Sequence, residues 1–246
     1  MTLKIVECRS PNHDARPHGA PIDILVLHYT GMQTADEALA RLCDPLAKVS
    51  AHYTIGRDGR VYAHVPEERR AWHAGVSWWA GETNVNARSI GIELVNPGHE
   101  FGYVPFAESQ IAALIDLAQG ILTRHPIPPH RVLGHSDVAP ARKMDPGELF
   151  PWAELAEFGI GIWPDSPPPR GEVERAERVR VGGTDTDYAA ALARFGYGLP
   201  PHTEVPLESV ISAFQRHFRP SEITGKWDGE CATALAALLS PKAVAS

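Results

Sequence analysis

Apolar runs and helical repeats alternate along the N-terminal two thirds of the chain. Residues 22–27 (IDILVL) and 89–95 (SIGIELV) are short apolar stretches rich in β-branched side chains, which is typical of buried strands. Over residues 107–124, apolar side chains recur at the three- and four-residue spacing of an amphipathic helix. Strand and helix signals that alternate in this way favour an α/β fold.

Shorter signals add two elements to this region. A capping-box pattern at Thr34 and Glu37 predicts a helix that runs from there to about Leu42. An Asp-Gly pair predicts a β-hairpin that joins the strand-like segments 52–55 and 61–65.

The pattern changes after residue 163. Residues 164–171 (PDSPPPRG) are polar, rich in proline and poor in core-forming side chains, which is typical of a linker. Three short helical patterns follow, over residues 188–195, residues 207–218 and from residue 228 onward. We therefore predict an α/β domain over residues 1–163, a linker over 164–183, and a small all-α domain of three helices over 184–246.

Composition excludes several classes of protein. The chain has 23 basic and 30 acidic residues and a net charge of −7, so we expect no nucleic-acid partner. An apolar content of 43% excludes wholesale disorder, and no apolar run is long enough to predict a membrane span. Three scattered cysteines provide neither a disulfide framework nor a CxxC metal knuckle, whereas twelve histidines offer nitrogen ligands.

The N-terminal residues bear on the compartment. MTLKIVECRS contains no apolar core of the kind found in secretory signals. Cys8 invites comparison with a lipoprotein cysteine, but the apolar stretch before it is too short and includes Glu7. The sequence as it stands therefore predicts a cytoplasmic protein, and a periplasmic one is the alternative if a leader was removed.

Candidate catalytic residues are dispersed, because the HExxH, GxSxG and phosphate-loop motifs are absent. His28 ends the first buried strand, His135 ends a short strand that begins at residue 132, and Asp145 follows ten residues later. Two imidazoles and one carboxylate, with a fourth position left for water, form a catalytic zinc set. The same residues could instead be hydrogen-bonded structural histidines and a turn-forming aspartate.

Six sequence blocks occur in an order that matches a known family. They are 22–31 (IDILVLHYTG), 50–60 (SAHYTIGRDGR), 70–76 (RAWHAGV), 89–96 (SIGIELVN), 132–137 (VLGHSD) and 141–147 (ARKMDPG). Together they resemble the zinc-dependent N-acetylmuramoyl-L-alanine amidases of the amidase-2 family, which includes AmiD-like and AmpD-like enzymes. The resemblance implies a central mixed β-sheet flanked by helices, the fold of the peptidoglycan recognition proteins.

The resemblance implies specific roles for five residues. His28, His135 and Asp145 match the zinc ligands, Glu93 matches the catalytic glutamate, and Lys143 matches the lysine that stabilises the transition state. Elementary chemistry agrees for two of them. A carboxylate at Glu93 is costly in an otherwise apolar strand unless it has a task or a partner. Lys143 and Asp145 point to the same side of an extended segment.

Other residues in these blocks are candidates for substrate binding. They are His52, His73, Trp72, Asn86 and Arg88. Aromatic side chains can pack on sugar rings, and Arg88 could pair with a peptide carboxylate. For His52 and His73 the alternative is a role as a buried partner of the metal ligands. Trp78 and Trp79 are expected to pack within their own loop.

The resemblance implies a function. A zinc hydrolase of this family cleaves the amide between N-acetylmuramic acid, or its 1,6-anhydro form, and L-alanine of stem peptides during cell-wall turnover or recycling. The expected partner is peptidoglycan or a muropeptide, and we expect a monomer. The C-terminal segment resembles a peptidoglycan-binding domain, and a helical cap without a ligand is the alternative.

Two other functions stay open at this point. The chain could be a non-catalytic peptidoglycan recognition protein on the same fold, or, more remotely, an inhibitor of a polymerase. The complete set of predicted ligands, together with Glu93 and Lys143, favours the enzyme.

Overall fold

The computed structural model describes residues 3–164 and 185–240. Its centre is a six-stranded mixed sheet in the order β1 (Ile5–Glu7), β5 (Val61–Ala63), β4 (Tyr53–Ile55), β7 (Ser89–Leu94), β3 (Ile24–Tyr29) and β8 (Val132–Gly134). Strands β4, β7, β3 and β8 are parallel, β5 is antiparallel to β4, and β1 is parallel to β5. The short strands β2 (His13–Ala15) and β6 (Arg69–Ala71) form a separate antiparallel pair.

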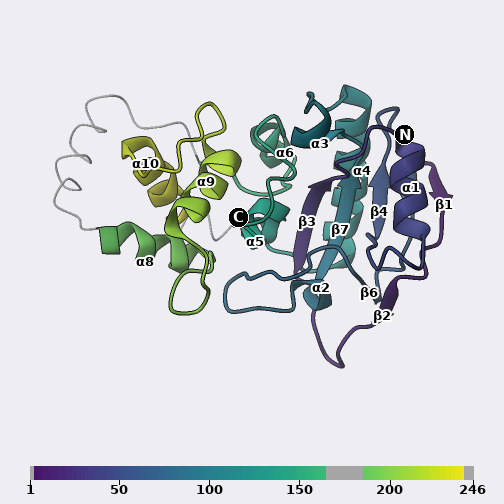
Figure 1. Cartoon of the computed structure of the whole chain (residues 1–246), viewed down its shortest axis with the longest axis horizontal. Coiled ribbons are helices and arrows are strands. Elements are labelled where there is room, and N and C mark those ends of the chain that lie inside the picture. The colour runs from purple at the N-terminus through teal and green to yellow at the C-terminus, as the bar shows by residue number, and fades with distance from the viewer. Residues whose placement is uncertain (1–2, 165–184, 241–246) are drawn as a thin grey trace.

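Helices flank this sheet, as predicted (Figure 1). They are α1 (Ala35–Cys43), α2 (Val85–Arg88), α3 (Gly98–Phe101), α4 (Glu108–Arg124), the 3₁₀ turn η1 (Pro129–Arg131), α5 (His135–Val138), α6 (Trp152–Glu157), α8 (Asp185–Phe195), α9 (Leu207–Phe218) and α10 (Gly229–Leu238). No helix in the described parts of the chain is long and apolar enough to cross a membrane.

Side-chain alternation along β3 separates the two faces of the sheet. Leu25 and Leu27 join the hydrophobic cluster that the apolar stripe of α4 covers, whereas Ile24 and Val26 belong to a second cluster. Because strand residues two apart share a face, His28 lies on the same face as Ile24 and Val26. The strand therefore buries one face under α4 and places its histidine on the other.

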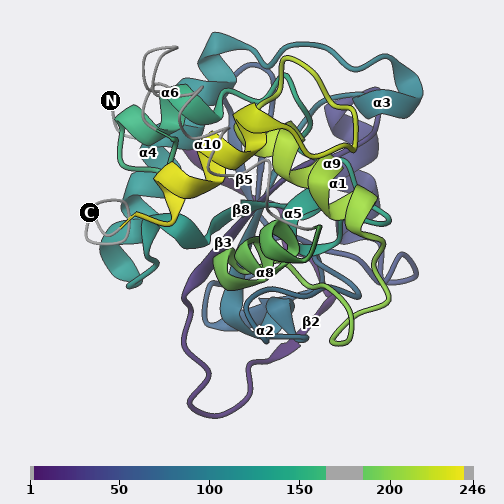
Figure 2. The ribbon, with the colours of Figure 1, turned by 90° about the vertical axis from the view of Figure 1, so that its left-hand side faces the viewer.

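The C-terminal helices share this second cluster. Apolar residues of α8, α9 and α10 lie in one buried group with Ile24, Val26 and Leu133 of the sheet and Val138 of α5. Figure 2 shows these three helices in front of α5 and the β3–β8 side of the sheet. The helical segment and the sheet therefore pack against each other directly.

Most of the predicted elements are confirmed. The capping box between Thr34 and Glu37 is present at the start of α1, and the hairpin, the long helix and the three C-terminal helices are formed. The predicted linker over 164–183 lies outside the described residues except for residue 164. The division into domains stays a prediction.

One boundary differs from the sequence-based prediction. His135 does not end strand β8 but begins helix α5. The carboxylate of Asp137 explains the change, because its Oδ2 accepts a hydrogen bond from the Gly134 N–H at 2.7 Å. A carboxylate that satisfies a free N–H at a helix N-terminus stabilises the start of that helix.

Candidate metal centre and active site

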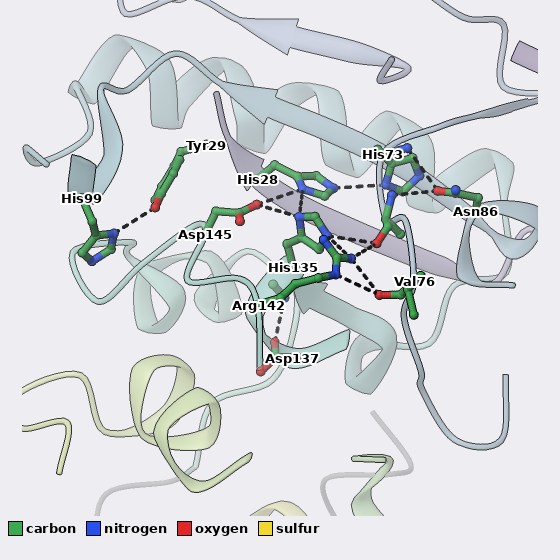
Figure 3. A network of polar contacts seen from close by, with 12 residues as sticks. His28, Tyr29, His73, Val76, Asn86, His99, His135, Asp137, Arg142 and Asp145 are labelled. Carbon is green, nitrogen blue, oxygen red and sulfur yellow. Dashed lines mark hydrogen bonds and ion pairs between the residues drawn. The ribbon is translucent and has the colours of Figure 1, made fainter. Parts of the chain in front are cut away.

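Three buried side chains converge on the face of the sheet that carries Ile24 and Val26 (Figure 3). His28 Nδ1 lies 2.9 Å from His135 Nδ1, and Asp145 Oδ2 lies 3.0 Å from each of these nitrogens. All three residues are buried. The predicted ligands are therefore brought together, although up to 117 positions of sequence separate them.

Parallel strand pairing explains how two of these residues meet. Leu27 of β3 is in register with Gly134 of β8. The residues that follow them, His28 and His135, therefore lie side by side at the carboxyl ends of these two strands. The loop after α5 then runs back alongside the start of this helix, where the Ser136 N–H donates to the Asp145 carbonyl at 2.9 Å. Strand ends and the following loop thus deliver all three side chains.

A chain of hydrogen bonds sets the tautomer of His28. The Ser89 hydroxyl donates to the Val85 carbonyl at 2.7 Å, so its oxygen accepts from His73 Nε2 at 3.1 Å. His73 Nδ1 is then an acceptor, 3.1 Å from His28 Nε2, which must carry the proton. His28 Nδ1 is left with its lone pair directed into the site.

His135 is oriented in the same way. Its Nε2 donates to the Ala74 carbonyl at 3.1 Å, which leaves Nδ1 unprotonated in the neutral ring. Burial, followed by the neighbouring His135, lowers the pKa of His28 to about 4, so the His28 ring is neutral near pH 7.

This arrangement fits a metal ion. Three lone pairs point at one another across about 3 Å with the imidazole protons committed elsewhere, and such an arrangement is repulsive unless a cation lies between them. Nitrogen and carboxylate ligands suit a divalent transition metal, and three protein ligands leave a position open for chemistry. His28, His135 and Asp145 thus form a possible metal-binding group.

Gly91 leaves room for the ring of His73 next to the candidate metal ligands. Gly91 of β7 lies on the site face, and a Cβ atom there would stand 2.5 Å from the ring of His73. Glycine inside a strand commonly marks the close approach of another group. The glycine in the SIGIELV segment therefore allows His73 to lie behind His28.

Glu93 lies beside the metal centre. It is in register with His28 on the neighbouring strand, and its Oε2 is buried without a hydrogen-bond partner. Burial, reinforced by the Asp145 charge, raises the pKa of Glu93 well above its ordinary value, and the Lys143 charge partly opposes this rise. A carboxyl group with a raised pKa and a free oxygen is suited to carry a proton.

Lys143 acts on this site through its charge. It is partly buried on the loop that leads to Asp145, and its backbone N–H donates to the Ala139 carbonyl at 3.0 Å. Its ammonium lowers the pKa values of both Glu93 and His28. The cation therefore contributes to the same electrostatic environment as the ligands.

The structure assigns two predicted substrate-binding histidines to the interior. His52 is fully buried, its Nδ1 accepts from the Gly91 N–H at 2.9 Å, and its Nε2 faces the Arg69 carbonyl at 3.1 Å. His73 is buried behind His28. Both rings use their nitrogens within the protein, which supports the alternative of buried partners, and contact of either ring with a substrate stays a prediction.

Other predicted substrate-binding side chains also make internal contacts. Asn86 Oδ1 accepts from the backbone N–H groups of His73 and Ala74, at 3.1 and 2.8 Å. Arg88 is paired with Asp23 and Glu82. These bonds give both residues structural roles, and their contact with a substrate stays a prediction.

The predicted tryptophans behave differently from one another. Trp72 is partly buried, and its backbone N–H donates to Ser50 Oγ at 2.9 Å. Trp79 does not pack only within its own loop, because its ring lies 5.0 Å from that of Tyr197, which follows α8. Trp78 stacks on His202 at 5.7 Å. The loop aromatics therefore join the α/β part to the C-terminal segment.

Sequence reasoning missed two residues that support the centre. Arg142 Nη2 donates to the Ala74 carbonyl at 2.5 Å and the Val76 carbonyl at 2.7 Å, and so holds the segment that His135 also contacts. Asp137, two residues after a ligand, accepts from Gly134 as described above. Both residues lie within the quoted blocks 132–137 and 141–147, but nothing in those blocks singled them out, because their partners are backbone groups and distant segments.

Asp137 also receives two hydrogen bonds from the C-terminal segment. Tyr197 Oη lies 2.7 Å from Asp137 Oδ1, and His217 Nδ1 lies 2.7 Å from Oδ2. All three side chains are buried. Helix α5, which begins with the candidate ligand His135, is therefore connected directly to the helical part of the chain.

Comparisons with known proteins extend this picture. A family model described as N-acetylmuramoyl-L-alanine amidase matches residues 18–148. The chain is 43% identical over 240 residues to the N-acetylmuramoyl-L-alanine amidase AmiD of Escherichia coli, which covers 89% of this chain and 82% of the relative.

Two solved structures are similar over nearly the whole chain. One is E. coli AmiD in complex with the substrate anhydro-N-acetylmuramic acid-L-Ala-D-gamma-Glu-L-Lys, with 39% identity, a TM-score of 0.78 and 93% of each chain covered. The other is AmpDh3 of Pseudomonas aeruginosa in complex with anhydromuramic pentapeptide, with 38% identity, a TM-score of 0.81, and 90% of this chain and 92% of that chain covered. Because the family model matches more than half of the sequence and the likeness includes the C-terminal helices, the chain belongs to the N-acetylmuramoyl-L-alanine amidase family.

Proposed function

We propose that this protein is a zinc-dependent hydrolase that cleaves the amide bond between N-acetylmuramic acid, or its 1,6-anhydro form, and L-alanine of peptidoglycan stem peptides. The observation that carries the proposal is the convergence of His28, His135 and Asp145 beside a carboxyl group that has no partner. Family membership supports the same reaction.

Zinc is the proposed ion because its preferences match the donor set. Two imidazole nitrogens and one carboxylate oxygen form a typical catalytic zinc site, which keeps a position open. When bound, zinc supplies Lewis acidity and lowers the pKa of water. Both histidines present their Nδ1 lone pairs without a conformational change, because His73 and Ala74 hold the opposite nitrogens.

The chain's own residues handle the proton and the charge. Glu93, with its raised pKa, accepts the proton of the attacking water and delivers it to the departing alanine nitrogen. Lys143 places a positive charge near the oxygen that becomes negative in the transition state. The burial of the ligands strengthens these electrostatic effects, since the surrounding dielectric is low.

The proposed substrates are muropeptides. Both similar structures were determined with anhydromuramic peptides, one described as a substrate complex. Intact peptidoglycan and soluble 1,6-anhydro-muropeptides share the scissile bond, so both are candidate substrates. We further propose peptidoglycan binding by the C-terminal helices, on the likeness of their sequence to such domains.

Mass spectrometry of a defined anhydro-muropeptide after incubation with the protein tests this function. We expect a free peptide whose new N-terminus is L-alanine and an anhydromuramic acid product. A chelated sample is the control, and we expect activity to return when zinc is restored. A folded, metal-loaded protein that binds the muropeptide and releases no peptide would contradict the enzyme and favour a recognition protein.

Elemental analysis tests the choice of metal. We expect about one zinc per chain for the purified protein and loss of that zinc in the His28→Ala variant. Stoichiometric iron or manganese in place of zinc, with full activity, would overturn the identity of the ion.

The compartment stays a proposal. We propose the cytoplasm, with the periplasm as the alternative. Fractionation of cells that express the native gene distinguishes the two.

A further inference from the structure

A second group of potential ligands lies at the opposite edge of the sheet from β8. Cys8 directly follows edge strand β1, Cys43 is the last residue of α1, and the buried His64 lies beside them. The two sulfur atoms are 3.2 Å apart although 35 positions separate the residues. Since β1 and β8 form opposite edges of the sheet, this group is distinct from the proposed zinc centre.

Hydrogen bonds hold the two cysteine-bearing segments together. Ser10 Oγ donates to the Leu42 carbonyl at 2.5 Å. Asn12 Nδ2 donates to the carbonyls of Asp44 and Val49 at 2.8 and 2.9 Å. Both polar side chains are buried, so the contacts are built into the fold. The thiols are therefore held as neighbours by contacts that do not involve sulfur.

His64 argues against a metal in this cluster. Its Nδ1 lies 2.7 Å from the Cys8 carbonyl oxygen, which can only accept, so Nδ1 carries the proton. Its Nε2 then accepts from the Thr54 hydroxyl at 2.8 Å. With both nitrogens in use, two sulfurs are the ligands left, and a structural zinc site needs four.

Electrostatics points in the same direction. Burial, followed by the neighbouring Cys8, raises the pKa of the Cys43 thiol to about 12. A metal would hold both sulfurs permanently as thiolates, which this environment disfavours, whereas thiol–disulfide exchange needs one thiolate only transiently. A disulfide carries no charge, so burial does not oppose it.

We propose that Cys8 and Cys43 are a site of covalent cross-linking, forming a disulfide with a low-molecular-weight disulfide such as oxidised glutathione as the oxidant. One sulfur, as its thiolate, attacks the glutathione disulfide, forms a mixed disulfide and releases one glutathione. The second sulfur displaces the other glutathione. One sulfur–sulfur bond forms and one breaks, two electrons pass to glutathione, and the two thiol protons end on the two released glutathione thiols.

The cross-link ties the edge strand to the body of the fold. Strand β1 has only three residues and pairs along one side with β5, so its attachment is otherwise limited. A disulfide reduces the conformational entropy of the unfolded chain and keeps an edge strand in place. The bond would persist in an oxidising compartment and stay open in a reducing cytosol. The proposal does not depend on the amidase activity.

Thiol counting in the folded protein tests the proposal. The folded protein is incubated in glutathione buffers of increasing oxidation, then unfolded in acidic denaturant and alkylated so that the buried Cys231 also reacts, and analysed by intact mass and peptide mapping. Of the three cysteines, we expect two to become protected together, with a linked peptide that joins Cys8 to Cys43. The Cys8→Ser and Cys43→Ser variants should form no intramolecular bond, whereas the matched control Cys231→Ser should form it as the wild type does.

Thermal unfolding provides an independent readout. We expect oxidation to raise the Tm of the wild type and of Cys231→Ser by roughly 5–10 °C, and to leave that of Cys43→Ser unchanged. Three alkylatable thiols under oxidising conditions that leave the fold intact would overturn the proposal. So would accumulation of a stable mixed disulfide at Cys8 alone, or tight Cd²⁺ binding that requires both cysteines and blocks the cross-link.

Discussion

At the scale of single residues, the candidate site combines groups whose chemistry depends on their neighbours. His28 and His135 can each offer Nδ1 to a metal ion because Nε2 of each ring has another partner. Glu93 is suited to the proposed role of proton carrier because its buried Oε2 has no hydrogen-bond partner. From the sequence, strand ends and ligand chemistry offered the two histidines as one of two interpretations, and the family likeness favoured that one and added Glu93. Their protonation states depend on contacts with His73 and Ala74, which a linear pattern does not reveal.

The Glu93→Gln substitution tests the proton-carrying role. Because the amide cannot accept the proton of the attacking water, we expect the turnover rate to fall by about 10²–10⁴-fold, measured by peptide release. We expect the metal content to stay at the wild-type level, since Glu93 is not a ligand. The matched control is Glu157→Gln on the exposed end of α6. A rate near that of the wild type would disprove the assignment.

The His73 substitution tests the hydrogen-bond chain behind the metal. In His73→Ala, the Nε2 proton of His28 loses its acceptor, and we expect the metal dissociation constant to rise by about 10–100-fold. A competition assay with a chelating dye measures it. His73→Gln retains an acceptor and should recover part of the affinity, whereas exposed His18→Ala should change nothing. Equal affinities in all four proteins would show that the chain has no effect on the metal.

At the scale of elements, strand register assembles the site. The pairing of β3 with β7 and β8 aligns His28 with Glu93 and brings His135 next to it. Apolar runs predicted the two long strands β3 and β7, and the repeat of apolar side chains predicted helix α4. These elements are long enough for their buried faces to appear as a pattern in the sequence. The short strands β1, β2 and β6 were missed because three residues are too few to show a period, and their pairing is non-local.

Hydrogen bonds to Glu67 connect β4 with α4 and make a pH-dependent contribution to the free energy of unfolding. Its carboxylate accepts hydrogen bonds at 2.7 Å from Tyr53 of β4, Arg124 of α4 and the adjacent His125. Although burial raises the pKa of Glu67, these bonds outweigh it and lower the pKa to about 2 from 4.5.

The sign of the pH effect follows from this lowered pKa. The unfolded chain binds a proton at Glu67 at higher pH than the folded chain does, so this stabilisation is present above about pH 4.5 and is lost as pH falls toward 2. Urea unfolding measures it. We expect the free energy of unfolding to fall more steeply between pH 5 and pH 3 for the wild type than for Glu67→Gln. Parallel curves would contradict this contribution.

At the scale of the whole molecule, the α/β part and the C-terminal helices share a buried cluster and a polar connection at Asp137. The sequence predicted the three helices but not this contact. The pairing of Tyr197 and His217 with Asp137 spans 60 and 80 positions, and no local pattern encodes such a distance.

The Tyr197→Phe substitution tests this connection. It removes the donor to Asp137 Oδ1 in a buried setting, and we expect a loss of about 1–3 kcal/mol in the free energy of unfolding. Because the parts share a core, thermal unfolding should stay a single transition at a lower Tm. Tyr62→Phe, whose hydroxyl accepts a long hydrogen bond from exposed Arg60 at 3.5 Å, is the control and should stay near the wild type. Two separate transitions would show that the parts unfold independently.

The bond that is cleaved is the central claim, and hydrolysis of an anhydro-muropeptide in H₂¹⁸O tests it most directly. The metal-loaded protein should release the intact stem peptide with a free L-alanine N-terminus and no heavy oxygen, while the anhydromuramic acid product gains one ¹⁸O in its lactyl carboxylate. Label in the peptide product, or cleavage at any other bond, would contradict the account.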